Sequence, residues 1–149
     1  MTQERLAYII IMFCAGIGIP LMAAMNARMG RLIGSPSASA MVLFAAAFVI
    51  ATLVTAATSG FAPLKALDTA PAYLFIGGLL IAFYLLSISW IAPRFGLGNA
   101  IFCVLIGQLA ASTAIDLFGL FGAAQKPLSF YGLAGLAFMA VGVTLSVFR

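Results

Sequence analysis

The sequence contains no histidine and only three acidic residues among its 149 residues. Metal clusters and activated nucleophiles depend on histidine, cysteine and carboxylate side chains at suitable spacing. The two cysteines, Cys14 and Cys103, stand alone in separate apolar runs, which indicates packing residues and not a disulfide framework. We therefore expect no metal site, no cofactor and no enzymatic activity.

Charged residues are scarce, at 7% of the chain against 65% hydrophobic residues. An ordinary soluble domain is about 25% charged, so water would not wet a surface built from this composition. The gaps between charges are about as long as a membrane helix, roughly 20 residues. The bilayer is therefore the predicted solvent, and the net charge of +4, spread over helix ends, predicts no nucleic-acid partner.

Five membrane spans follow from these gaps and from helix start and stop signals. We place them at residues 6–25, 37–58, 72–91, 98–116 and 131–148. Ser35 and Pro36 predict a capped start for the second span. Asn26–Arg31 is expected to form a polar exit from the first span, and Ala92–Gly98 a tight turn. The prediction is an all-α, multi-pass integral membrane protein with one domain over residues 1–149.

The basic residues are divided almost evenly between the two sides of such a bundle. One side holds Arg5, Lys65 and Lys126, and the other holds Arg28, Arg31, Arg94 and Arg149. Lys and Arg in short loops set the orientation of membrane proteins. Two alternatives stay open: insertion both ways up, or one orientation fixed by Arg28 and Arg31. Dual insertion would let two copies pair with inverted topology, as in many transporters.

Three segments resemble a known family. They are GIPLMAAMNARMGRLIGSPSASAMVLF from Gly18, GGLLIAFYLLSISWIAPRFGLGNA from Gly77 and IGQLAASTAIDLFGLFG from Ile106. Together they resemble the half-size, five-helix branch of the drug/metabolite transporter superfamily. The resemblance implies a bundle equal to one half of a ten-helix transporter, located in the inner membrane. It also implies a homodimer, with an antiparallel arrangement, or pairing with a homologous half.

Polar residues in the fourth span are the first candidates for a substrate pathway. Gln108, Ser112 and Asp116 follow one another at intervals of four residues, so they form a polar stripe that shifts gradually around the helix. Gln108 lies about 15 Å along the span from Gly98, where its amide needs a partner or a cavity. Asp116 lies about 27 Å along, at the rim. For Asp116 a solvated helix end and a proton or cation relay both remain open.

Two other spans add pathway candidates. Asn26 follows the first span and is either a pathway residue or a helix C-cap. Tyr84, Ser87 and Trp90 are three residues apart in the third span. They would suit an aromatic or amphipathic substrate, but helix packing and an interfacial aromatic belt are alternatives.

Glycine and proline mark a hinge and a contact. Pro20 cannot donate to the carbonyl of Gly16, and Gly18 weakens the same stretch, so a hinge is predicted there. A kink satisfied by a neighbouring helix is the alternative. Gly135 and Gly142 lie two turns apart in the fifth span and predict a dimer seam or, alternatively, close packing within the chain.

The leading prediction is a transporter that exports small amphipathic or metabolite-like compounds by alternating access in an inverted-topology dimer. Its partners would be membrane lipid, a small-molecule substrate and a second half. Two alternatives remain: a non-transporting membrane subunit that assembles or stabilises another membrane protein, and a flippase for lipid-linked substrates.

Overall fold

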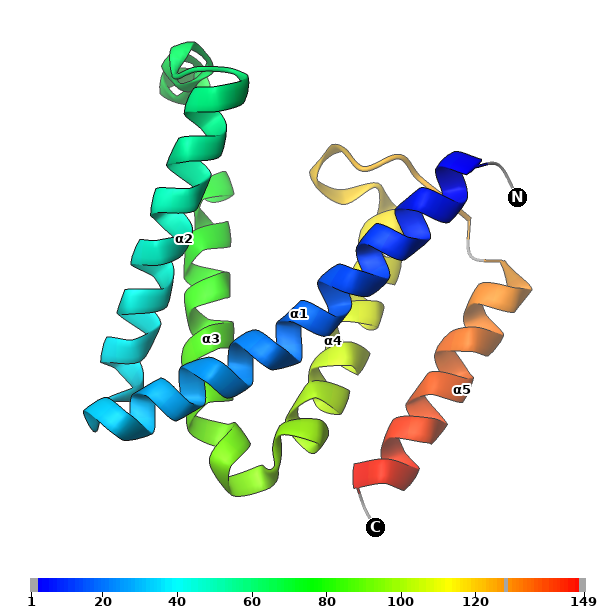
Figure 1. The fold of residues 1–149 in the computed structure, drawn as a ribbon. Coiled ribbons are helices and arrows are strands. Elements are labelled where there is room, and N and C mark those ends of the chain that lie inside the picture. The colour runs from blue at the N-terminus through cyan, green and yellow to red at the C-terminus, as the bar shows by residue number, and fades with distance from the viewer. Residues whose placement is uncertain (1–2, 128, 148–149) are drawn as a thin grey trace. The chain divides into compact units, whose positions relative to one another are not determined.

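The computed structural model describes residues 3–127 and 129–147, and within these ranges the chain is helical with no strand. Figure 1 shows the α-helices. Their bounds are α1 Gln3–Ile33, α2 Pro36–Thr58, α3 Ile76–Phe95, α4 Leu97–Phe118 and α5 Phe130–Val147. Short 3-10 segments complete the order: η1 (Ala62–Thr69), η2 (Ala72–Phe75) and η3 (Leu120–Gly122). Phe148, the last residue of the predicted fifth span, lies outside the described residues.

Four helical segments are long and apolar enough to cross a membrane: Gln3–Ile33, Pro36–Thr58, Ala72–Phe95 and Leu97–Phe118. In α5 the apolar stretch Gly132–Ser146 is shorter. At most 17% of the most apolar window in any of the four is buried within the chain. Large apolar side chains exposed on this scale require lipid or a partner around them. The prediction of an all-α membrane protein is confirmed at this level.

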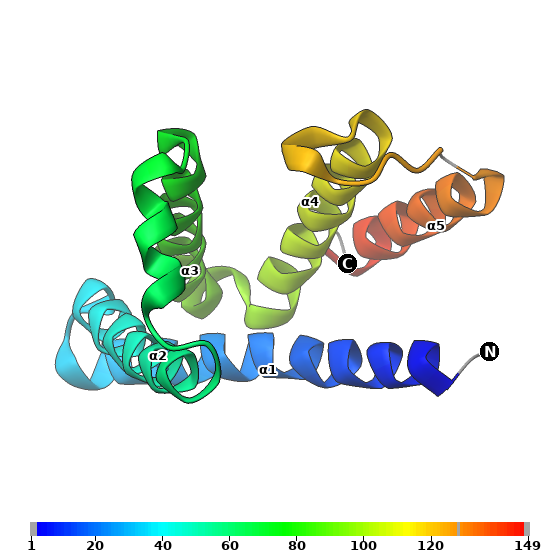
Figure 2. The ribbon, with the colours of Figure 1, turned by 90° about the horizontal axis from the view of Figure 1, so that it is seen from above.

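The chain divides into two compact units, Met1–Arg94 and Phe95–Arg149. In the first unit, α1 contacts the beginning of α2 and the end of α3 (Figure 1). η1 and η2 join α2 to α3, as the view from above shows (Figure 2). In the second unit, α4 packs against α5. The prediction of a single domain stays a prediction.

The first helix is longer than its predicted span. The sequence analysis ended the span at Met25 and treated Asn26–Arg31 as a polar exit, but α1 continues to Ile33. No residue between Asn26 and Arg31 prevents helix, since the only glycine there, Gly30, costs about 1 kcal/mol relative to alanine. Pro20 lies inside this helix, which is continuous across it.

The junction between α1 and α2 is tightly packed. Ser35 caps α2, as predicted, by accepting a hydrogen bond from the backbone N–H of Ala38 at 3.2 Å. Gly30 of α1 faces this start so closely that a Cβ would lie 3.1 Å from Pro36 Cα and 3.2 Å from Ser39 Oγ. Glycine is therefore what allows the two backbones to approach at this point.

The turn after α3 is shorter than the predicted Ala92–Gly98. Helix α3 continues through Pro93 to Phe95, and α4 begins at Leu97. Only Gly96 separates them, with φ of 91°, a value that glycine adopts without a steric penalty. The proline does not end the helix, because it lies in the last turn of α3 and removes a single hydrogen bond.

Candidate functional site at the crossing of α1 and α3

A buried polar contact joins α1 to α3. The side-chain amide of Asn26 donates to Ser89 Oγ at 2.7 Å, and Ser89 Oγ donates to the carbonyl oxygen of Leu85 at 2.7 Å. Asn26 is 2% exposed and Ser89 is 3% exposed. The Ser89 hydroxyl thus accepts a hydrogen bond from α1 and donates one within α3. This pair links two segments that are 63 residues apart in the sequence.

The length of α1 removes one of the two predicted roles of Asn26, that of a helix C-cap. Because α1 continues to Ile33, Asn26 lies about two turns before the helix end and is not a C-cap. Its side chain instead occupies the interior of the first unit. The predicted assignment of Asn26 to a substrate pathway stays a prediction.

Ser89 is the residue that the sequence analysis missed. The buried face of α3 consists of Leu85, Ile88, Ser89 and Ala92, which follow the i, i+3, i+4, i+7 spacing of one helix face. That spacing was visible in the sequence. However, α3 is apolar nearly all round, so the sequence offered no polar side from which to choose the buried one.

Asn26 retains one unsatisfied atom. Its carbonyl oxygen Oδ1 is buried and accepts no hydrogen bond from any described residue. A buried acceptor without a donor costs about 1–3 kcal/mol, which water or a ligand donor would recover. Asn26 Oδ1 is therefore a buried hydrogen-bond acceptor for which the described residues supply no donor.

Ser89 also lines a pocket in the same unit, with a volume of about 450 Å³. The pocket lies among the ends of α1 and α3 and the start of α2. Its lining residues are Ala27, Gly30, Arg31, Gly34, Pro36, Ser89, Trp90, Pro93 and Arg94. Two arginines from different helices face this space, and no ion pair joins either of them to a carboxylate among the described residues.

Trp90 and Arg94 form the α3 wall of this pocket. The Arg94 guanidinium lies 4.5 Å from the centroid of the Trp90 ring, a cation–π geometry. Arg94 Nη1 also donates to the backbone carbonyl of Trp90. Of the three predicted α3 candidates, Trp90 is therefore at the pocket. Ser87 is half-buried elsewhere on the helix, and Tyr84 has a buried hydroxyl with no partner among the described residues.

The three candidates on α4 are exposed. Gln108, Ser112 and Asp116 all face outward from the second unit. Ser112 Oγ donates to the carbonyl of Leu109 in its own helix at 3.1 Å, and the described residues provide no hydrogen-bond partner for the Gln108 amide. Asp116 lies in the last turn of α4, beside a small pocket of about 170 Å³ that Lys126 also lines.

The predicted hinge and dimer seam lie on open helix surfaces. A Cβ added at Gly16, Gly18, Gly135 or Gly142 would meet no atom within 4 Å outside its own helix neighbourhood. Within its own unit, each of these glycines therefore has no close packing partner among the described residues. The seam on α5 and the hinge around Pro20 both stay predictions.

Comparison with known proteins identifies the family. A family model described as "Putative inner membrane exporter, YdcZ" matches residues 7–145, almost the whole chain. The chain belongs to this exporter family. The match confirms the resemblance that the three sequence segments indicated. No curated protein and no solved structure matches the chain.

Membership in the exporter family agrees with the helices described above. The protein is a multi-pass inner membrane protein with several apolar helices of membrane length. At this coarse level, membership in the exporter family makes it a membrane transporter. Both the crossing of α1 and α3 and the pocket beside it lie within the matched residues.

Proposed function

We propose that this chain is one half of an exporter, pairing with a second copy of inverted topology. The complete transporter would then have two bundles of five spans each, with substrate held between them. The exported compounds would be small and amphipathic or metabolite-like, released by alternating access.

The observation that carries this proposal is the open polar stripe on α4. Gln108 lies within a membrane-length helix, is exposed on the second unit and has no hydrogen-bond partner among the described residues. An unpaired amide is costly in hydrocarbon, so α4 is expected to face a wet cavity or a second half there. The family description supports export as the activity that such a cavity serves.

Flux through purified protein in liposomes tests the proposal. A panel of amphipathic drugs and small metabolites is loaded, and release is compared between the wild type, Gln108→Leu and Asp116→Asn. We expect Gln108→Leu to reduce flux more than Asp116→Asn, because Gln108 lies deeper along its helix. Ala110→Leu, also exposed on α4, is the matched control for added apolar volume.

Two results would contradict the proposed transport through α4. Absence of flux and of ligand-induced stabilisation across the panel would favour a non-transporting membrane subunit. A larger loss in Asp116→Asn than in Gln108→Leu would move the pathway to the end of α4. Reporters at the C-terminus test the pairing separately, since signal on both sides of the membrane is expected for dual insertion and signal on one side rejects it.

A further inference from the structure

We infer that the pocket of about 450 Å³ between α1, α2 and α3 binds the phosphate headgroup of an anionic lipid. This inference does not depend on the proposed transport activity. It rests on the position of the pocket along the helices, on the chemistry of its two arginines and on the distribution of acidic residues in the first unit.

Helix length places the pocket at the level of the headgroups. Helix α1 has 31 residues and is about 46 Å long at 1.5 Å per residue, whereas the hydrocarbon core is about 30 Å thick. Arg31 lies in the last turn of α1 and Arg94 in the last turn of α3, and both helical segments are long enough to cross the membrane. Both arginines are therefore at helix ends, where a membrane-length helix reaches the headgroup layer.

The α3 wall agrees with this depth. Trp90 is 58% exposed and lies one turn before the end of α3. Tryptophan is enriched where hydrocarbon meets headgroups, since its ring is apolar and its N–H is polar. Two independent helices thus place the same pocket at the membrane interface.

The pocket chemistry is that of a phosphate site. Guanidinium groups match the oxygens of a phosphate with parallel N–H donors. Arg94 is already held by the Trp90 ring and the Trp90 carbonyl, so little side-chain freedom remains to be lost on binding. The N-terminus of α2 borders the pocket at Pro36, and its helix dipole adds positive potential.

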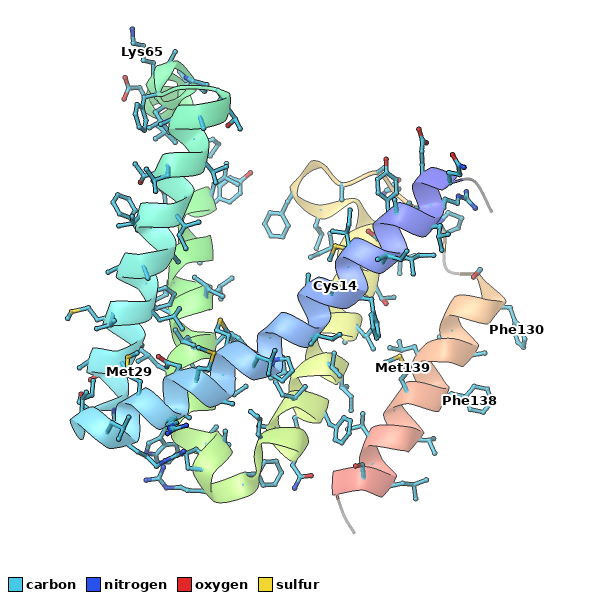
Figure 3. The ribbon with its side chains drawn as sticks, viewed as in Figure 1. Cys14, Met29, Lys65, Phe130, Phe138 and Met139 are labelled. Atoms are coloured by element: carbon cyan, nitrogen blue, oxygen red, sulfur yellow. The ribbon has the colours of Figure 1, made fainter. Side chains whose placement is uncertain are left out.

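No carboxylate described in the first unit lies near the two arginines. The acidic residues that the structure describes in the first unit are Glu4, at the start of α1, and Asp68, in η1. Asp68 follows α2, which is 23 residues and therefore about 35 Å long, so it lies far from Pro36. Figure 3 shows the same separation, with Lys65 of η1 at one end of α2 and Met29 of α1 near the other.

Trp90 is the only tryptophan in the sequence, so all tryptophan fluorescence reports on this pocket. The purified protein is placed in phosphatidylcholine liposomes with a minor fraction of brominated lipid, either phosphatidylglycerol or phosphatidylcholine. Bromine quenches tryptophan fluorescence only at short range, so the loss of fluorescence reports brominated lipid next to Trp90. We expect brominated phosphatidylglycerol to quench more strongly than brominated phosphatidylcholine at equal mole fraction.

The variant that tests the site is Arg31→Gln, because it leaves in place Arg94, whose cation–π contact with the Trp90 ring affects its fluorescence directly. Its preference for phosphatidylglycerol should fall about fivefold, the factor expected from one arginine at an anionic surface. Lys65→Gln removes the same charge at the other end of α2 and should leave the preference unchanged. Equal melting temperatures of the two variants show that both remain folded.

Three results would overturn the inference. The first is equal quenching of the wild type by both brominated lipids. The second is an equal loss in Lys65→Gln and Arg31→Gln, which would indicate net charge and not this pocket. The third is relief of quenching by glycerol 3-phosphate at constant ionic strength, which would assign the pocket to a soluble phosphate compound and not to lipid. Absence of relief supports the lipid headgroup.

Discussion

Two polar side chains are buried and hydrogen-bonded in the first unit, but two similar ones are exposed on α4 of the second. In the first unit Asn26 and Ser89 are buried against each other and joined by a hydrogen bond. On α4, Gln108 and Ser112 are exposed, and Ser112 bonds only within its own helix. Both pairs are an amide and a hydroxyl in apolar helices. The comparison teaches that such a pair is either satisfied inside its own unit or left for something outside that unit, and that composition does not distinguish the two cases.

The largest difference in stability is expected when the amides of Asn26 and Gln108 are each replaced by a carboxylate. Asn26→Asp removes the N–H that donates to Ser89 and buries a carboxylate, so the free energy of unfolding should fall by about 3–5 kcal/mol. Gln108→Glu makes the same chemical change at an exposed position and should cost less than about 1 kcal/mol. Unfolding of both variants in one detergent measures this difference, and equal losses would show that Asn26 is not buried as described.

Adding a methyl group to a glycine is expected to give the next largest difference in stability, between Gly30 and Gly135. In Gly30→Ala the new Cβ would lie against the backbone of Pro36, and we expect a loss of about 1–2 kcal/mol in unfolding free energy. Gly135→Ala meets no neighbour, so the chain should gain up to about 1 kcal/mol from helix propensity.

Gly135→Ala also tests the predicted dimer seam. If α5 forms the seam, cross-linking of the Gly135→Ala dimer in membranes should weaken while the stability of the chain does not. Gly77→Ala, another open glycine, is the control for a methyl group outside the seam. Unchanged cross-linking in Gly135→Ala would remove Gly135 from the seam.

Removing one hydroxyl gives the smallest expected difference. Ser89→Ala leaves the Asn26 amide without its acceptor, and the expected loss in unfolding free energy is about 1–2 kcal/mol. Ser112→Ala removes an exposed bond within α4 and should change stability by less than about 0.5 kcal/mol. Thermal unfolding of the two alanine variants side by side measures both values. A larger loss at Ser112 would contradict the burial pattern.

Much of the secondary structure was predictable from local chemistry. Ser35 and Pro36 marked the start of α2 because capping depends on residues next to one another in the chain. The boundaries of α1 and α3 were less accurate. Asn26–Arg31 is polar but compatible with helix, and Pro93 lies where a helix tolerates it, so neither stretch had to end a helix.

The sequence by itself determined the solvent of this protein, the helical class and the exporter family, because apolar runs of membrane length and an ordered set of residues are properties of the chain alone. Only the tertiary structure decided that Ser89 and not Ser87 meets Asn26, and that Arg31 and Arg94 share one pocket. Helices that are apolar on every side carry no pattern to say which face turns inward. The packing of one helix on another makes that choice.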